Sequence, residues 1–141
     1  MANPVSWSNE KKRPLILPAL QPDLNRGINH SELHRLRAAD LENYSRQTEY
    51  ECGTRILVGL KDYVFDMTAV KESLSPGGDL SVYAFKDISY ALAKYSASET
   101  DTLIQGYDSL SSEEKGVLDS WVGIFLTRFP VIGMLLPAEQ L

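Results

Sequence analysis

The chain has 141 residues, enough for a single domain with one hydrophobic core. Hydrophobic residues make up 43% of it and charged residues 23%, the composition of an ordinary soluble protein. The net charge of -5 argues against a nucleic-acid-binding protein, which would normally carry a basic face.

Cys52 is the single cysteine, so no disulfide can form within the chain. Glu49 and Glu51 flank it, and this acidic setting disfavours the thiolate that a catalytic cysteine needs. No apolar run approaches the ~20 residues of a membrane-spanning helix. Residues 1–20 also lack the continuous apolar stretch of a secretory signal. We therefore expect this protein to meet a membrane only through a partner.

Residues 1–30 form an arm that differs in composition from the rest of the chain. The prolines that exclude a continuous helix or a central strand are Pro4, Pro14, Pro18 and Pro22. An apolar arm of this kind is suited to a groove on another protein, or it folds back on its own domain. We predict that it binds other protein subunits. The side chains expected to do so are Leu15, Ile16, Leu17 and Leu20.

Residues 31–141 carry the signals of a compact α+β domain. Its first predicted element is a short helix over residues 38–44, which carries Leu41 and Tyr44. Hydrophobic side chains on one face of such a helix would pack onto the body of the domain.

Two β-rich stretches come next, RILVGL at 55–60 and YVFDMT at 63–68. Both are rich in the β-branched and aromatic residues that favour strands. Lys61 and Asp62 separate them, and this two-residue spacing predicts an antiparallel hairpin.

A tight turn at SPGG (75–78) precedes a helical pattern over residues 82–95. The apolar residues at helical spacing in that pattern are Phe85, Ile88, Leu92 and Tyr95. A further short helix is predicted over residues 97–103.

The clearest helix of the chain follows Ser111, a good N-cap residue with Glu114 three residues later in a capping box. Pro130 limits how far this helix can extend. The residues of its apolar stripe are Val117, Leu118, Trp121, Val122 and Phe125.

No constellation of reactive residues is visible in the sequence. His30 and His34 are the only histidines, and on a helix they would share one face at the spacing of two metal ligands. A third ligand is not evident nearby, so we expect solvated polar residues here and no metal site. The carboxylates are scattered, and Gly77-Gly78 lacks the other residues of a phosphate loop. We expect no catalytic residues.

The order of these segments resembles the cytochrome b5-like haem/steroid-binding domain, and most closely the membrane-associated progesterone receptor family. The resemblance runs from about Leu36 to Leu136. It rests on RILVGLKDYVFDMT, SPGGDLSVYAFKDISYALA, YDSLSSEEKGVLDSW and FLTRFPVIGMLL, in this order. It implies a short mixed sheet with helices around a haem-type pocket in residues 31–141, preceded by the extended arm.

The positions that hold haem in these relatives are changed in this chain. In cytochrome b5 a histidine immediately before Pro-Gly-Gly ligates the iron, and that position is Ser75 here. The progesterone-receptor branch instead uses a tyrosine two residues after the second turn glycine, a position that falls on Leu80. Its glycine after Phe-Ala becomes Phe85, and its Lys-Tyr pair near the end reads Arg128-Phe129.

These changes predict a degenerate pocket. An alkyl side chain cannot coordinate iron, and an empty buried cavity would cost roughly 24 cal/mol per Å³. Filling the cavity with Leu80 and Phe85 avoids that cost, so we expect no bound cofactor. Haem remains the alternative, with Tyr83 as a displaced ligand. Equally, Tyr83 could replace the family's phenylalanine as a packing residue.

The resemblance and the arm together predict a non-catalytic accessory or scaffold subunit of a larger complex. The alternative is a haem, sterol or lipid-binding protein of the progesterone-receptor type. Because relatives usually sit at membranes, we expect a membrane-associated complex, with the mitochondrial inner membrane favoured over the endoplasmic reticulum or cytoplasm.

Overall fold

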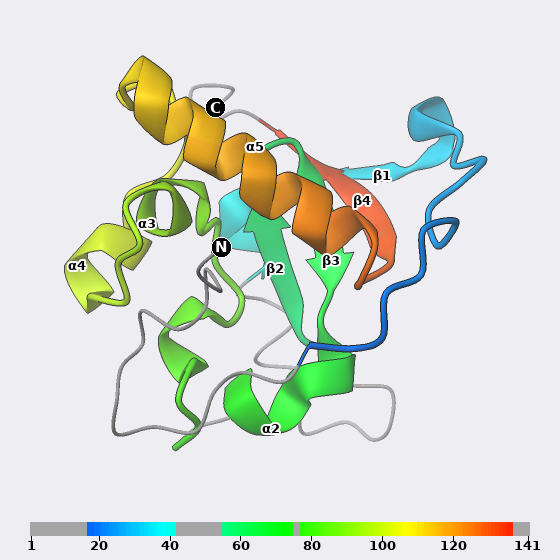
Figure 1. The fold of residues 1–141 in the computed structure, drawn as a ribbon, viewed down its shortest axis with the longest axis horizontal. Coiled ribbons are helices and arrows are strands. Elements are labelled where there is room, and N and C mark those ends of the chain that lie inside the picture. Colours follow the sequence, from blue (N-terminus) through cyan, green and yellow to red (C-terminus); the bar gives the residue numbers. More distant parts are fainter. Residues whose placement is uncertain (1–16, 42–54, 75–76, 137–141) are drawn as a thin grey trace.

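A four-stranded mixed sheet forms the centre of the protein (Figure 1). The computed structural model describes residues 17–41, 55–74 and 77–136. The strands are β1 (His34–Leu36), β2 (Leu57–Leu60), β3 (Tyr63–Asp66) and β4 (Val131–Leu135). Their order is β1-β4-β3-β2, with β1 parallel to β4 and the other neighbours antiparallel. The predicted α+β class with a short mixed sheet is confirmed.

The predicted hairpin is formed by β2 and β3. Leu60 pairs with Tyr63, so Lys61 and Asp62 make the two-residue turn, in which Lys61 has a φ of 58°. All four residues of β2 are buried. Val58 and Leu60 belong to the main core cluster on one face of the sheet. The opposite face packs on a smaller cluster made by Leu41, Leu57, Val64 and Leu135.

Helix α5 (Ser112–Leu126) lies across the face of the sheet that carries the main core (Figure 1). The capping box is present as predicted, because Glu114 N donates to Ser111 Oγ and Ser111 N donates to Glu114 Oε1. The Phe125 ring packs edge-on against Phe65 of β3, with ring centroids 5.3 Å apart. The side chains that α5 buries are Leu118, Trp121, Val122 and Phe125.

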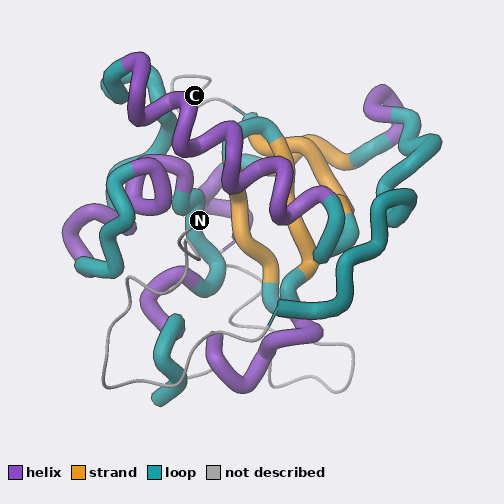
Figure 2. Tube along the Cα trace, viewed as in Figure 1, coloured by secondary structure: helices purple, strands orange, loops and turns teal. Residues whose placement is uncertain are grey.

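The remaining helices are short: α3 and α4 lie to one side of α5, α2 lies below the sheet in this view, and η2 stands on the opposite side next to β1 (Figure 1 and Figure 2). The helix predicted over residues 97–103 is present as α4, and the Ser98 side chain caps it by accepting from Asp101 N. The short helices are η2 (His30–Glu32), η4 (Thr68–Val70), α2 (Lys71–Leu74), η5 (Ser81–Tyr83), α3 (Ser89–Ala93) and α4 (Glu99–Thr102).

The continuous helix predicted over residues 82–95 is wrong. Phe85 has a left-handed backbone with a φ of 62°, and α3 begins only at Ser89. Residues 85–88 instead run along the outer edge of β2, where Phe85 N donates to Leu57 O at 2.9 Å. This tertiary pairing outweighs the helical spacing of the apolar residues.

The two histidines do not lie on one helix, the arrangement in which they would share a face. His34 begins β1, whereas residues 30–32 form the separate 3-10 turn η2. The helix predicted over residues 38–44 is seen at 38–41, and Tyr44 lies outside the described residues.

Residues 17–28 of the arm fold back onto the end of α5 and the start of β4 (Figure 1). Asn25 holds them there: its Nδ2 donates to Leu126 O at 2.7 Å and to Phe129 O at 3.0 Å. Its Oδ1 accepts from Val131 N at 2.9 Å. Leu17 packs against the main core, so this part of the arm belongs structurally to the domain.

Replacing Asn25 by alanine should lower the free energy of unfolding by about 2 kcal/mol, because three backbone groups lose a partly buried partner. Urea denaturation measures this change. The matched control is Asn29→Ala, which removes only exposed bonds to Ser31 and should cost less than about 0.5 kcal/mol. Equal losses in the two variants would contradict the role of Asn25.

Candidate functional site

The glycine turn stands at one end of the site. Gly77 has a φ of 89°, and a Cβ on Gly78 would overlap the carbonyl oxygens of Glu72 and Ser73, so both positions require glycine. Leu80 N donates to Ser73 O at 2.8 Å, which closes the turn. Ser75, the first predicted pocket residue, lies outside the described residues.

The turn directs Leu80 into the protein. Its side chain is 7% exposed and belongs to the main core cluster. No atom of this side chain can accept or donate a hydrogen bond or bind a metal. At the position that the resemblance assigns to a tyrosine, the chain therefore presents a buried hydrocarbon.

Phe85 is half-buried and packs against both hydrophobic clusters. Its left-handed backbone conformation is one that glycine adopts without strain and that costs an L-residue roughly 1–2 kcal/mol. The chain accepts this strain where the resemblance assigns a glycine. The aromatic ring thereby fills space between the two clusters.

Tyr83 is 3% exposed, and its hydroxyl donates to the carbonyl oxygen of Ser96 at 2.6 Å. This bond ties η5 to the loop that follows α3. The Tyr83 side chain thus packs in the core and makes a partly buried hydrogen bond.

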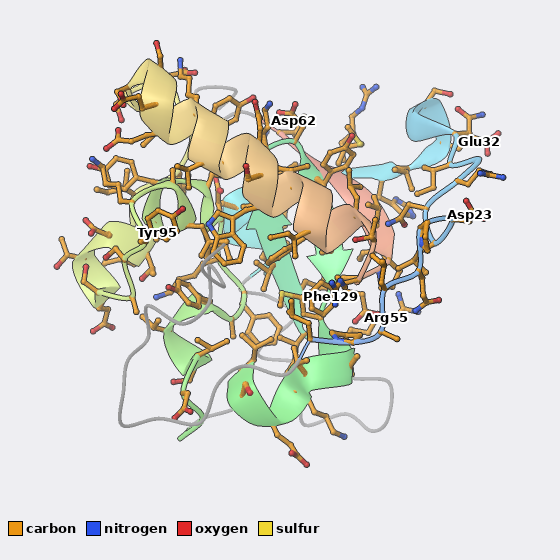
Figure 3. The ribbon with its side chains drawn as sticks, in the orientation of Figure 1. Asp23, Glu32, Arg55, Asp62, Tyr95 and Phe129 are labelled. Carbon is orange, nitrogen blue, oxygen red and sulfur yellow. The ribbon has the colours of Figure 1, made fainter. Side chains whose placement is uncertain are left out.

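Arg128 and Phe129 point to different environments. Phe129 is fully buried, and its ring packs against Phe125 with centroids 5.2 Å apart (Figure 3). Arg128 extends toward the arm, where its Nη1 donates to Pro18 O at 3.0 Å. Among the described residues, no partner satisfies the buried Nε of Arg128.

A buried carboxylate fixes the segment after Phe85. Asp87 Oδ1 accepts from Ser89 N and Ser89 Oγ, and its Oδ2 accepts from Gly106 N at 2.9 Å. Ser89 Oγ in turn accepts from Lys61 N at 2.7 Å. Burial raises the pKa of the Asp87 carboxyl, and the hydrogen bonds from Ser89 and Gly106 oppose the rise.

The charged groups near the β2–β3 turn are paired with one another. Lys61 Nζ lies 2.6 Å from Asp119 Oδ1, and this hydrogen bond raises the lysine pKa. The Tyr107 hydroxyl donates to Asp62 Oδ1 at 2.8 Å. Partial burial and this bond raise the pKa of Tyr107 to about 12. These groups connect the turn to the loop before α5 and to α5 itself.

The structure therefore brings four of the six predicted pocket residues, Leu80, Tyr83, Phe85 and Phe129, into or against one hydrophobic cluster. Arg128 turns to the arm instead. Sequence reasoning missed Asp87 and Ser89 as the residues that anchor this segment. The spacing Asp-Ile-Ser before α3 is a local signal that could have indicated such a turn.

Within the described residues, no group of three His, Cys, Asp or Glu side chains could hold a metal ion.

The arm residues predicted to bind a partner divide into three groups. Leu15 and Ile16 lie outside the described part of the chain, Leu17 packs on the domain's own core, and Leu20 is 59% exposed.

No protein-family profile matches this chain. The "Probable steroid-binding protein 3" of Arabidopsis thaliana is 38% identical over 78 residues, which are 55% of this chain and 77% of that protein. The human "Membrane-associated progesterone receptor component 2" is 29% identical over 115 residues, 78% of this chain and 51% of that protein.

A solved structure from Arabidopsis thaliana, described as having a cytochrome b5 like fold, superposes with a TM-score of 0.64 and 33% identity. The match covers 77% of this chain and 95% of that one. In the parts of this chain that are described, none of the helices has the length and apolar character needed to cross a bilayer. The chain belongs to the cytochrome b5-like family of steroid-binding proteins and membrane-associated progesterone receptor components.

Proposed function

We propose that this protein is a non-catalytic cytochrome b5-like domain that has lost haem ligation and serves as an accessory or scaffold subunit of a larger, membrane-associated complex. The observation that carries the proposal is the burial of Leu80 at the position that the resemblance assigns to an iron-ligating tyrosine. A leucine side chain has no lone pair to offer iron.

The surrounding residues support a closed pocket. Phe85 packs a ring between the two clusters despite its strained backbone, and Phe129 contributes a fully buried ring without a hydroxyl. Tyr83 would have to leave its bond to Ser96 O before it could bind iron. Breaking that buried bond costs about 1 kcal/mol or more, which disfavours the displaced ligand.

The polar groups of this region support a structural role as well. The Asp87 carboxylate is occupied by three donors, and the Lys61 ammonium is paired with Asp119. A general acid or base must be free to exchange a proton with a substrate. These groups instead hold the turn, α3 and α5 together.

The arm supports the scaffold role through Leu20. This leucine is exposed on a segment that is fixed by Gln21 N, which donates to Thr127 O at 2.8 Å. An apolar side chain held rigidly at the surface loses little conformational entropy on binding. We propose that Leu20, together with Leu15 and Ile16, binds another subunit, and that the complex lies at the mitochondrial inner membrane.

A second candidate function is suggested by the names of the relatives, two of which refer to a steroid or to progesterone. In this case the domain would bind a sterol or another lipid in the space beside residues 77–85. Such a ligand needs an apolar cavity but no iron ligand, so the loss of the tyrosine would not exclude it.

Haem added to the purified protein should give no stoichiometric Soret band after free haem is removed by gel filtration. The reason is that Leu80 offers no axial bond and the pocket is filled. A stoichiometric band would contradict the proposal, and its loss in Tyr83→Phe would assign the ligand to Tyr83. Saturable binding of progesterone without haem would favour the second candidate.

Replacing Leu20 by serine should shift the protein from a large complex to the size of the free subunit in native gels of mildly solubilised cell membranes. The apolar contact made by the arm would be lost. Leu103→Ser is the matched control, because Leu103 is 64% exposed but lies beyond α4, away from the arm. Retention of the complex by Leu20→Ser would contradict a role for this leucine.

A further inference from the structure

A cleft of about 300 Å³ separates the returning arm from the body of the domain. Its lining comes from the arm, β3, the end of α5 and the start of β4. Its lining residues are Pro22, Asn25, Arg26, Ile28, Tyr63, Leu126, Thr127 and Val131. None of these is among the pocket residues at 75–85 or at 128–129, so this is a separate site.

The floor and walls of the cleft are mainly apolar. Ile28, Leu126 and Val131 supply aliphatic surface, and Tyr63 adds an aromatic side chain. Clefts of this size, apolar with a few polar groups, are typical of small-molecule sites. The lining therefore favours a ligand with a hydrocarbon body.

Two of the polar groups in the lining are already used within the protein. The Asn25 amide makes its three bonds to the backbone of residues 126, 129 and 131. Thr127 Oγ1 donates to the carbonyl oxygen of Ile124 at 3.1 Å. Neither group can donate a hydrogen bond to a ligand without breaking a bond that holds the arm or the end of α5.

Arg26 is the cationic group of the lining, and its present partner is easily replaced. Arg26 Nη2 lies 2.7 Å from Asp23 Oδ1, but the two side chains are 76% and 66% exposed. Exposed ion pairs of this kind contribute at most about 1 kcal/mol. Asp23 lies on the arm (Figure 3), and through this ion pair it would compete with a ligand anion for the guanidinium.

We propose that this cleft binds a small amphipathic carboxylate. Its alkyl body would lie on Ile28, Leu126 and Val131, and its carboxylate would bind Arg26 in place of Asp23. Guanidinium and carboxylate form charge-assisted, often bidentate hydrogen bonds, which makes an anion of this shape the best match to Arg26.

Binding would also hold the arm in place. The lining joins the arm residues Pro22, Asn25, Arg26 and Ile28 to residues of β3, α5 and β4, so a ligand contacts both sides of the junction. A molecule that binds only when the arm lies against the domain stabilises that arrangement. Exchange of the Gln21 amide hydrogen, which is bonded to Thr127 O, should therefore slow when the ligand is bound.

Octanoate is a suitable probe, followed by chemical shifts of the backbone amides below its micellar concentration. We expect saturable shifts at residues 22–28 and 126–131, and slower exchange at Gln21. Arg26→Gln should weaken octanoate binding about fivefold by removing the cation. Lys115→Gln is the control, since it removes an exposed positive charge on the first turns of α5, away from the cleft.

The Asp23→Asn variant gives the sharpest test, because it removes the competing carboxylate and should strengthen octanoate binding about threefold. Octanol, which has the same alkyl chain without the charge, should respond to neither substitution. The proposal is overturned if octanoate does not bind, if its shifts map to residues 77–85, or if Arg26→Gln and Asp23→Asn leave its affinity unchanged.

Discussion

Three backbone hydrogen bonds join residues 85–88 to the outer edge of β2. Phe85 N donates to Leu57 O, Gly59 N to Lys86 O and Ile88 N to Gly59 O. The approach is close: a Cβ on Gly59 would lie 3.3 Å from the Asp87 Cα and 2.8 Å from a Leu135 methyl carbon. Gly59 is therefore the residue that permits this pairing, and the segment behaves as an added edge of the sheet.

The conformation of the candidate pocket follows from that pairing. The chain turns after η5 to run beside β2, and Phe85 takes a φ of 62° in this turn. This places the ring of Phe85 between the two hydrophobic clusters. Asp87 then fastens the segment to Ser89 and Gly106, so α3 starts at a defined position against α5. The position of the Phe85 ring is thus a consequence of backbone geometry as well as of side-chain size.

Local signals in the sequence were sufficient for the elements that depend on local interactions. The hairpin at Lys61-Asp62, the short helix α4 and the capping box of α5 were all predicted from neighbouring residues. Strands β1 and β4 were not predicted, because β1 pairs with a partner about a hundred residues away in the chain. The helix predicted over residues 82–95 failed for the same reason, since long-range pairing overrode its apolar spacing.

In the candidate site, too, features that depend on long-range contacts could not be predicted from the sequence. The resemblance identified Leu80, Phe85 and Phe129 by position, and the structure gives each of them a place in or against the core. The turn of Arg128 toward the arm could not be foreseen, because it depends on Pro18 lying beside the end of α5. Asn25, which holds the arm, carries no signal in its immediate sequence. Of the two interpretations of the arm that the sequence left open, Leu17 follows the one in which the arm folds back on its own domain, whereas Leu20 is exposed.

We propose that Leu80 and Phe85 together prevent haem ligation in this domain. The most direct test is the visible spectrum of the double variant Leu80→Tyr/Phe85→Gly after addition of haem, compared with Leu80→Phe/Phe85→Gly, which has the ring but lacks the phenol oxygen. We expect a stoichiometric Soret band for the tyrosine variant alone. A folded tyrosine variant without the band, or an equal band in the unaltered protein, would contradict it.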